Sequence, residues 1–268
     1  MDELKRLLVN RHEDVPLDLA ALQVANIEYP NLETACFLEL LDSHARELRQ
    51  WMTPNMGGAD WVALTRQYLF DHLGFHGNQA DYYNPANSCL NQVLLNRTGI
   101  PITLAIVYLE IARRLSRPVA GISLPGHFLV RYRDPEYSAY IDCFHGGQVL
   151  SMQECRELAW RVAKVDIAKN PDVISPASHW QIIVRMLNNL RGVYYRMQEM
   201  EKVIRVLDLL IAAMPESAEE YKQRGVVHMA LQQAQAALPD LEKYLTLAPA
   251  AADREDIEEH IAVLRRLL

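Results

Sequence analysis

The chain has 268 residues, of which 50% are apolar and 23% are charged, and this composition is typical of a globular protein with one large domain or two smaller ones. Its 27 Lys and Arg against 34 Asp and Glu give a formal net charge of −7, which argues against general nucleic-acid binding. The four cysteines form no Cys-x-x-Cys pair, so we expect reduced thiols. Without a signal sequence or a long apolar segment, the sequence predicts a cytoplasmic protein with no membrane partner.

The N-terminal part of the chain is expected to be helical. Apolar residues recur at helical spacing through residues 1–73, which predicts a helical layer. Gly57 and Gly58 interrupt this pattern, and Asp60 is the expected N-cap of the next helix. Residues 74–86 contain Gly, Asn and Pro without any periodicity, so we expect a loop there.

The central part is expected to change from helices to strands. A short helix is predicted from residue 87 or 88 to about Arg97, and a second helix over 102–115 is apolar nearly all round and therefore buried. After Pro118 the apolar period becomes two, which indicates strands, the last two of them joined as an antiparallel hairpin. A helix near 151–164 follows. The predicted strands cover 119–123, 126–132 and 139–144.

The C-terminal part repeats itself with a period of 34 residues. Leu187, Val193, Leu207 and Pro215 shift onto Tyr221, Val227, Leu241 and Pro249. A helix–turn–helix closed by proline at this period is what tetratricopeptide repeats look like, and two unrelated helical hairpins are the simpler alternative. We therefore expect two domains: residues 1–175, with a core at about 60–165, and residues 176–268, which hold the repeats and a capping helix.

The order of the central elements resembles the transglutaminase-like, or papain-like, core. In that superfamily a Cys at a helix N-terminus is the nucleophile, a His on the following strand is its base, and an Asp on the next strand orients the His. His127 and Asp142 lie on the two strands of the predicted hairpin. If His127 pairs near Phe144, Asp142 is its diagonal neighbour on the same face, whereas a shift by one residue puts them on opposite faces.

Four motifs together resemble the SirB-one family, and the resemblance extends over most of the chain. The motifs are NSCLNQVL at 87–94, GIPITL at 99–104, PGHFLVRY at 125–132 and IDCFHGG at 141–147. That family carries a transglutaminase-like core followed by tetratricopeptide-type helices. The resemblance implies an α+β, mostly helical fold: a helical N-terminal layer, a core with a small antiparallel sheet, and C-terminal helical hairpins. It implies no activity.

The nucleophile has two possible placements. If the turn at 99–101 follows the catalytic helix, Cys89 is the nucleophile in the order Cys, His, Asp, but this leaves a short helix and requires a strand where 102–115 is helical. If the turn at 115–118 follows the catalytic helix, 102–115 is that helix and the strands come in the correct order. We favour the second placement because it accounts for the helix, the strands and the hairpin together.

The favoured placement leaves the nucleophile position without a thiol. That position then falls at Pro101, Ile102 or Thr103. The Thr103 hydroxyl is a nucleophile in principle, but its high pKa demands strong base assistance, and Thr at a helix start is more often a cap. Cys89 is then best explained as a small buried hydrophobe, which is the usual role of an unpaired cysteine. His127 with Asp142 is either a relic or a working site.

A polar and aromatic loop is the remaining candidate binding feature. Asp81, Tyr82, Tyr83 and Asn87, together with Thr103, are predicted to line a recognition cleft, and a hydrogen-bonded loop packed on the core is the alternative. Two histidine motifs are weaker. His72 and His76 have the spacing of two metal ligands on a helix, but Gly74 lies between them and no Glu-His arrangement accompanies them. The His145-Gly146-Gly147 sequence is typical of a turn. We expect no metal and no cofactor.

Two functions of different classes follow from these features. The first is a non-catalytic or degenerate transglutaminase-like protein that acts as an adaptor and binds a protein or peptide partner. The alternative is a cysteine hydrolase or acyltransferase in which Cys89 attacks, His127 is the base and Asp142 orients it. The partner and the substrate are not specified by the sequence. We favour the adaptor because the favoured nucleophile position lacks cysteine.

Overall fold

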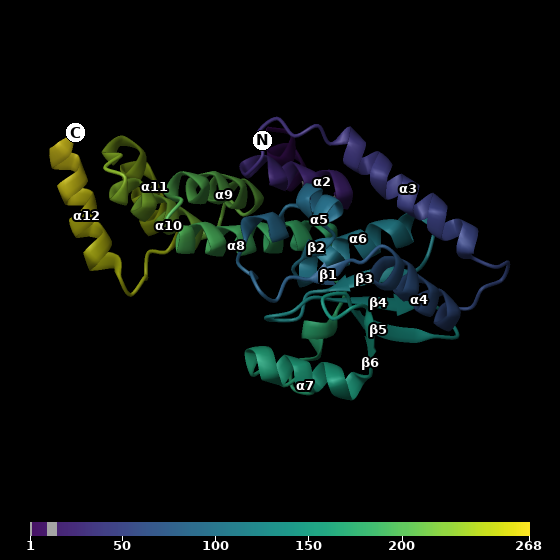
Figure 1. The fold of residues 1–268 in the computed structure, drawn as a ribbon. Helices are drawn as coiled ribbons and strands as arrows, with labels where there is room; N and C mark the ends of the chain where they lie inside the picture. The colour runs from purple at the N-terminus through teal and green to yellow at the C-terminus, as the bar shows by residue number, and fades with distance from the viewer. Residues whose placement is uncertain (1, 10–14) are drawn as a thin grey trace. The chain divides into compact units, whose positions relative to one another are not determined.

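The computed structural model describes residues 2–9 and 15–268, which form two compact units. One unit is Asp14–Met186; the other combines Met1–Glu13 with Leu187–Leu268. Figure 1 shows helices throughout the chain and a small sheet in the first of these units. The mostly helical α+β fold class is therefore confirmed. The division falls inside helix α8 (His179–Met197), and the domain boundary after residue 175 stays a prediction about parts that fold independently.

Helices form the first part of the Asp14–Met186 unit. They are α2 (Leu17–Val24), α3 (Ala35–Trp51), α4 (Gly58–Arg66) and a π-helical turn, η2 (Gln67–His72). Helix α4 begins two residues before the expected cap, because its N-cap is Gly57 and Asp60 lies inside its first turn. A Cβ on Gly58 would lie 2.6 Å from the Tyr132 ring, so the tight approach to the sheet requires glycine where the helix begins.

Two consecutive helices lead into the sheet. Helix α5 (Leu90–Asn96) follows a 3₁₀ turn, η3 (Pro85–Ser88), and α6 (Pro101–Arg114) is buried at every position from Pro101 to Ala112, as its apolar composition predicts. The expected loop at 74–86 contains a short strand, β1 (His76–Gly77), which pairs in parallel with β2 (Thr98–Gly99). This pairing joins the loop to the start of α6.

The four-stranded sheet is antiparallel, with the order β3 (Val119–Ile122), β4 (Leu129–Arg133), β5 (Ser138–Asp142) and β6 (Gln148–Leu150). Helix α6 packs against β3 and β4, and α7 (Met152–Ala163) packs with Ile122, Leu129 and Leu150 (Figure 1). Strand β6 is absent from the predicted strands. The expected helix near 151–164 is α7, and the Ser151 and Glu154 side chains cap its N-terminus reciprocally.

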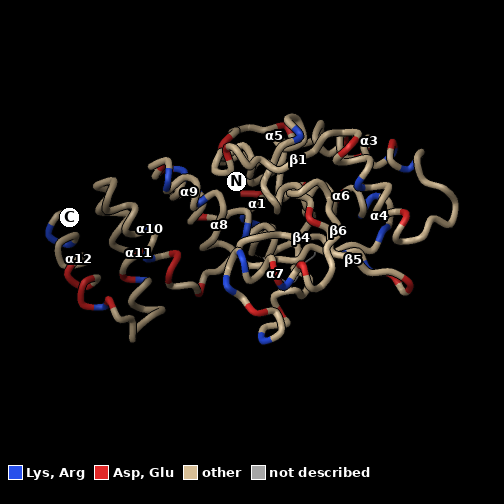
Figure 2. Tube along the Cα trace, turned by 60° about the horizontal axis from the view of Figure 1, so that its bottom comes forward, with Lys and Arg blue, Asp and Glu red and all other residues tan. Residues whose placement is uncertain are grey.

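The second unit is made of helical hairpins. Helices α9 (Met200–Ala213), α10 (Ala218–Ala230), α11 (Ala234–Leu247) and α12 (Arg254–Leu267) follow α8, and α1 (Asp2–Val9) packs on α9. A Cβ on Gly225 would lie 2.7 Å from the Leu241 side chain, so α10 and α11 approach each other closely at this glycine. Figure 2 shows acidic residues at the start of α12 and basic residues at its end, as a helix dipole favours.

No helix within the described residues is long and apolar enough to cross a membrane.

Candidate functional site

The structure brings His127 and Asp142 together. His127 Nε2 lies 2.9 Å from Asp142 Oδ2, and both side chains are buried. Val130 pairs with Ile141, so the register continued outward from the strands puts residue 127 opposite residue 144 and makes Asp142 the diagonal neighbour of His127. The sheet register thus produces the contact. The catalytic role of the two residues stays a prediction.

His145 joins this pair and was missing from the predicted site residues. Its Nδ1 lies 2.8 Å from the same Oδ2 of Asp142, and its ring stacks on the His127 ring with 5.9 Å between centroids. The turn after β5 positions it: Asp142 Oδ1 accepts hydrogen bonds from the backbone N–H groups of Phe144 and His145. An Asp that folds the next residues back onto itself is a known turn signal, and reading IDCFHGG in this way would have found His145.

The carboxyl group of Asp142 is held in its charged form. Burial by itself would raise the pKa of this carboxyl group. The hydrogen bonds and charges of His127 and His145 lower the pKa by more than burial raises it, so the net pKa lies below the usual value. The carboxylate is therefore a fixed negative charge between two imidazoles in a largely buried setting.

A half-buried arginine from α8 fixes the loop that carries His127. Arg185 Nη2 donates to the backbone carbonyl of His127 at 2.7 Å, and Nη1 donates to Ser123 Oγ at 2.7 Å. The same guanidinium lies 5.6 Å from the centroid of the Phe128 ring. Gly126 precedes His127 with a φ of +74°, a conformation that suits glycine. These contacts leave the imidazole little freedom to turn away from Asp142.

Aromatic rings connect the predicted recognition loop to this pair. The Phe144 ring lies edge-on to His127 at 6.3 Å, and Tyr82 lies edge-on to Phe144 at 5.9 Å. Burial raises the pKa of the Tyr82 hydroxyl, and the nearby charge of Arg185 partly offsets this rise. Tyr83 packs edge-on against Tyr82 and is 52% exposed. The two tyrosines thus present an aromatic surface beside the His127 site.

Hydrogen bonds from the buried side chains of Asn87 and Thr103 fix the conformation of this loop. The Asn87 amide donates to the carbonyls of Asp81 and Tyr82, at 2.7 and 3.2 Å, and both Asn87 and Thr103 are buried. Thr103 Oγ1 donates to the Asn87 carbonyl at 2.7 Å and accepts from the Ile100 N–H at 3.1 Å. These bonds match the hydrogen-bonded-loop alternative, whereas Asp81, Tyr82 and Tyr83 are exposed.

Cys89 is the N-cap residue of α5, and its side chain is fully buried. Burial is what we expect of a small core hydrophobe. The Cys89 thiol lies near Tyr29, whose pKa is raised first by burial and then by the charge of this thiol. The role of Cys89 as a nucleophile stays the alternative prediction.

Cys143 and Cys155 are poor nucleophiles. Burial raises the pKa of Cys143 well above its usual value, and the neighbouring charge of Asp142 raises it further. Burial raises the pKa of Cys155 to about 11. Both groups are therefore neutral thiols at physiological pH, and neither supplies a thiolate to the site.

A cavity of about 370 Å³ opens beside Asp142 and His145. It lies between β6 and α7, and besides these two residues it is lined by Gln148, Leu150, Glu154, Glu157, Leu158 and Arg161. The polar edge of the site is therefore accessible from one side, although His127 itself is buried. His127, Asp142 and His145 are also the described residues that are close enough together to share a metal ion.

The fold and site define a transglutaminase-like core joined to tetratricopeptide-type helices. The model of the transglutaminase-like superfamily matches residues 36–188, and the model of the tetratricopeptide repeat matches residues 190–262. The chain belongs to the transglutaminase-like superfamily. These matches confirm the expected core and repeats, and they support a role in protein interaction or peptide processing.

Relatives of similar length share both parts. A UPF0162 protein of Xylella fastidiosa is 35% identical over 255 residues, covering 94% of this chain and 91% of the relative. The UPF0162 protein YchA of Escherichia coli is 26% identical over 249 residues, covering 91% and 89%. F-box only protein 21 of Homo sapiens is 43% identical over 98 residues, which is 34% of this chain and 16% of that protein.

Proposed function

We propose that this protein is a non-catalytic adaptor, built on a transglutaminase-like core that has lost its nucleophile, and that it binds a protein or peptide partner. The observation that carries the proposal is the residue composition of the favoured nucleophile position. The base and its orienting carboxylate lie 2.9 Å apart, yet the start of α6, where the favoured placement puts the nucleophile, carries no thiol at Pro101, Ile102 or Thr103. Covalent catalysis requires a nucleophile within hydrogen-bond reach of the base.

The hydroxyl at this position is already hydrogen-bonded. Pro101 and Ile102 carry no nucleophilic group, and Thr103 is fully buried, with its hydroxyl accepting from the Ile100 N–H and donating to the Asn87 carbonyl. Activating this hydroxyl would require breaking buried hydrogen bonds and removing a proton of high pKa. Its bonds are those of a helix cap.

The partner surface that we propose consists of Tyr82, Tyr83 and Asp81, beside the His127 site. Exposed tyrosines offer large amphipathic contact area at low entropy cost, which makes them frequent anchors in protein interfaces. The tetratricopeptide-type helices add a second surface of a kind that commonly binds protein segments. The narrower assignment to the SirB-one family and a cytoplasmic location, supported by the expected reduced thiols, form part of this proposal.

Thiol reactivity tests the non-catalytic part. We expect iodoacetamide to modify the exposed Cys36 faster than the buried Cys89, and the His127→Ala variant to leave the rate at Cys89 unchanged. The rates are measured for each cysteine by peptide mass spectrometry. His72→Ala, which changes a distant exposed histidine, is the matched control. Rapid modification of Cys89 that His127→Ala abolishes and His72→Ala preserves would instead establish the cysteine-enzyme alternative.

A pair of aromatic substitutions tests the binding part. The immobilised full chain and its Tyr83→Ala variant are compared for the proteins that they retain from a bacterial extract. Trp160→Ala, at a residue on α7 that is 57% exposed, is the control. We expect at least one partner to be lost from Tyr83→Ala and kept by Trp160→Ala. If every retained protein binds all three forms equally, the tyrosine surface is not the partner site.

A further inference from the structure

We propose that His127, Asp142 and His145 form a binding site for a divalent transition-metal ion of the Zn²⁺ type. The three side chains offer two imidazole nitrogens and one carboxylate oxygen, which is a donor set that Zn²⁺ and its neighbours in the first transition row prefer. The sequence led us to expect no metal, because His72 and His76 lack the residues that accompany a zinc site and His145 was not weighed as a ligand. The site does not depend on the adaptor function.

The distances between the donor atoms fit one ion. Asp142 Oδ2 lies 2.9 Å from His127 Nε2 and 2.8 Å from His145 Nδ1. Ligand atoms bound to one ion at about 2.1 Å lie roughly 3.0 to 3.4 Å from each other, depending on the coordination geometry. An ion therefore requires these two separations to widen by only a few tenths of an ångström, and it requires the two imidazole nitrogens, which lie within 4.8 Å of each other, to reach a similar separation. It replaces the two N–H···O hydrogen bonds that hold the group together without it.

The donor atoms are oriented by bonds that an ion does not disturb. Asp142 Oδ1 accepts from the N–H groups of Phe144 and His145, at 3.0 and 3.3 Å, so Oδ2 is the oxygen left to face the imidazoles. The Gly147 N–H donates to the Asp142 carbonyl at 2.9 Å and closes the turn. Arg185 holds the backbone of His127. Supporting bonds of this kind fix ligand orientation in metal sites.

The cavity beside the site gives an ion access and an open coordination position. Asp142 and His145 line it, and the imidazole of His145 is 41% exposed. Glu154 and Glu157 on its wall add negative charge, and Arg161 opposes them. Three protein ligands leave at least one position of a tetrahedral ion to water, as in the zinc sites that keep an open position.

Zinc binding to the full chain without an affinity tag tests the proposal. Titration calorimetry with Zn²⁺ should give one ion per chain, and His145→Asn should weaken this binding by at least about tenfold, because a ligand is lost. His145 is exposed enough that the variant should fold, and its circular dichroism spectrum checks this. His72→Asn is the matched control, since His72 lies beside Glu47 at 3.4 Å on an exposed surface.

Co²⁺ provides a second measurement at the same site. The wild-type chain with one equivalent of Co²⁺ should show the visible absorption of a protein-bound ion, which His145→Asn and Asp142→Asn should remove and His72→Asn should keep. Weak binding of several ions that all variants share would overturn the proposal, because it would reflect the acidic surface alone. Absence of stoichiometric binding to the wild type would also overturn it, and neither result bears on the reactivity of Cys89.

Discussion

Two groups of buried carboxylates in the Asp14–Met186 unit differ in the cations that they face. Asp142 lies between two imidazoles, at 2.9 and 2.8 Å. Asp18 and Glu110 face guanidinium groups instead: Arg114 lies 2.7 Å from Asp18 and 2.6 Å from Glu110. A guanidinium is always charged and binds no metal, whereas an imidazole titrates near neutrality and is a common metal ligand. The difference indicates that one cluster serves stability and that the other is available for chemistry.

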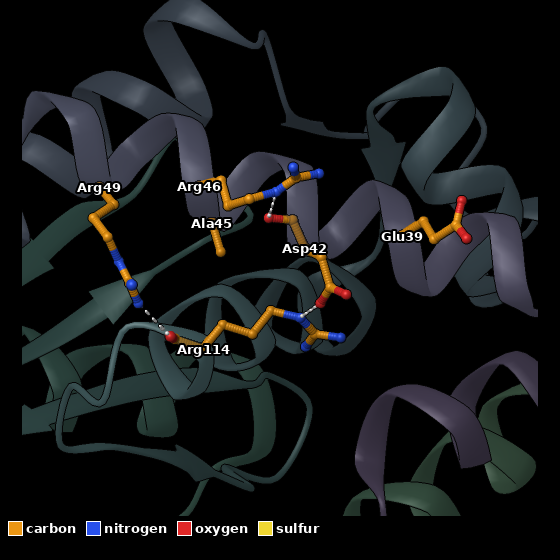
Figure 3. Close-up of a pocket in the computed structure, with 6 residues that line it drawn as sticks. All are labelled: Glu39, Asp42, Ala45, Arg46, Arg49 and Arg114. Carbon is orange, nitrogen blue, oxygen red and sulfur yellow. Dashed lines mark hydrogen bonds and ion pairs between the residues drawn. The ribbon is translucent and has the colours of Figure 1, made fainter.

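The cluster of Arg113, Arg114, Asp18 and Glu110 extends to the surface through the ion pair between Arg114 and the exposed Asp42. Figure 3 shows Arg114 reaching from α6 to Asp42 on α3, and Arg49 of α3 donating to the backbone carbonyl of Arg114. The cavity at this place has a volume of about 450 Å³, but its three arginines and Asp42 already bond one another or the backbone, as Figure 3 shows for Arg46. Its pairing is that of a brace between two helices.

The largest effect that we expect comes from removing the central guanidinium of this brace. Arg114→Met leaves Asp18 and Glu110 in buried surroundings with Arg113 as their remaining partner, so we expect a loss of about 3 kcal/mol in the free energy of unfolding. Urea denaturation measures it. Arg46→Met, at an exposed position on α3, should change stability by less than about 0.5 kcal/mol. Equal losses in the two variants would mean that the brace contributes nothing.

A smaller effect is expected at the turn that shapes the imidazole cluster. Gly147 has a φ of +71° and its missing side chain faces the Phe70 ring, so Gly147→Ala suffers both strain and overlap. We expect a loss of about 2 kcal/mol in the free energy of unfolding.

The neighbouring glycine separates these two costs. Gly146 has a φ of +69°, but a Cβ there would meet open space, so Gly146→Ala should lose only about 1 kcal/mol from strain. Thermal and urea denaturation of the two variants provide the comparison. If Gly146→Ala is as destabilised as Gly147→Ala, the packing of the turn against Phe70 is unimportant.

The smallest effect concerns a buried imidazole that lacks a direct carboxylate partner. Burial lowers the pKa of His44 below its usual 6.5, although the charge of Glu47 acts in the opposite direction. The unfolded chain therefore takes up a proton at pH values where folded His44 remains neutral. Stability should fall as the pH drops below about 6.5 and level off below the folded pKa. His44→Gln should remove part of this slope in urea titrations between pH 5 and pH 8. A steeper slope in the variant would contradict the assignment.

Several parts of this protein followed from the sequence alone. The period of 34 residues identified the C-terminal hairpins, because stacked repeats need the same packing positions in each copy. The all-round apolar composition identified α6 as the central helix, and alternation identified three of the four strands of the sheet. The proximity of His127 and Asp142 followed once the hairpin register was assumed.

Other features depended on contacts between distant segments. The pairing of β1 with β2 joins residues 76 and 98, and no local pattern specifies it. Strand β6 has three residues, which is too short for a periodic signal. Cys89 and Thr103 both lie at helix starts in the sequence, and only packing decided that both are buried, with the Thr103 hydroxyl bonded to the backbone of Ile100 and Asn87.

The sequence by itself determined the class of this protein: a transglutaminase-like core, the closeness of His127, two residues before β4, to Asp142 at the end of β5, and the helical repeats that follow. Periodicity and residue order carry that information because each is local to a helix, a strand or a turn. Only the tertiary structure decided which side chains share the site. The hydrogen bonds of Asp142 turn the chain after β5 and place the His145 imidazole against the same carboxylate oxygen as His127.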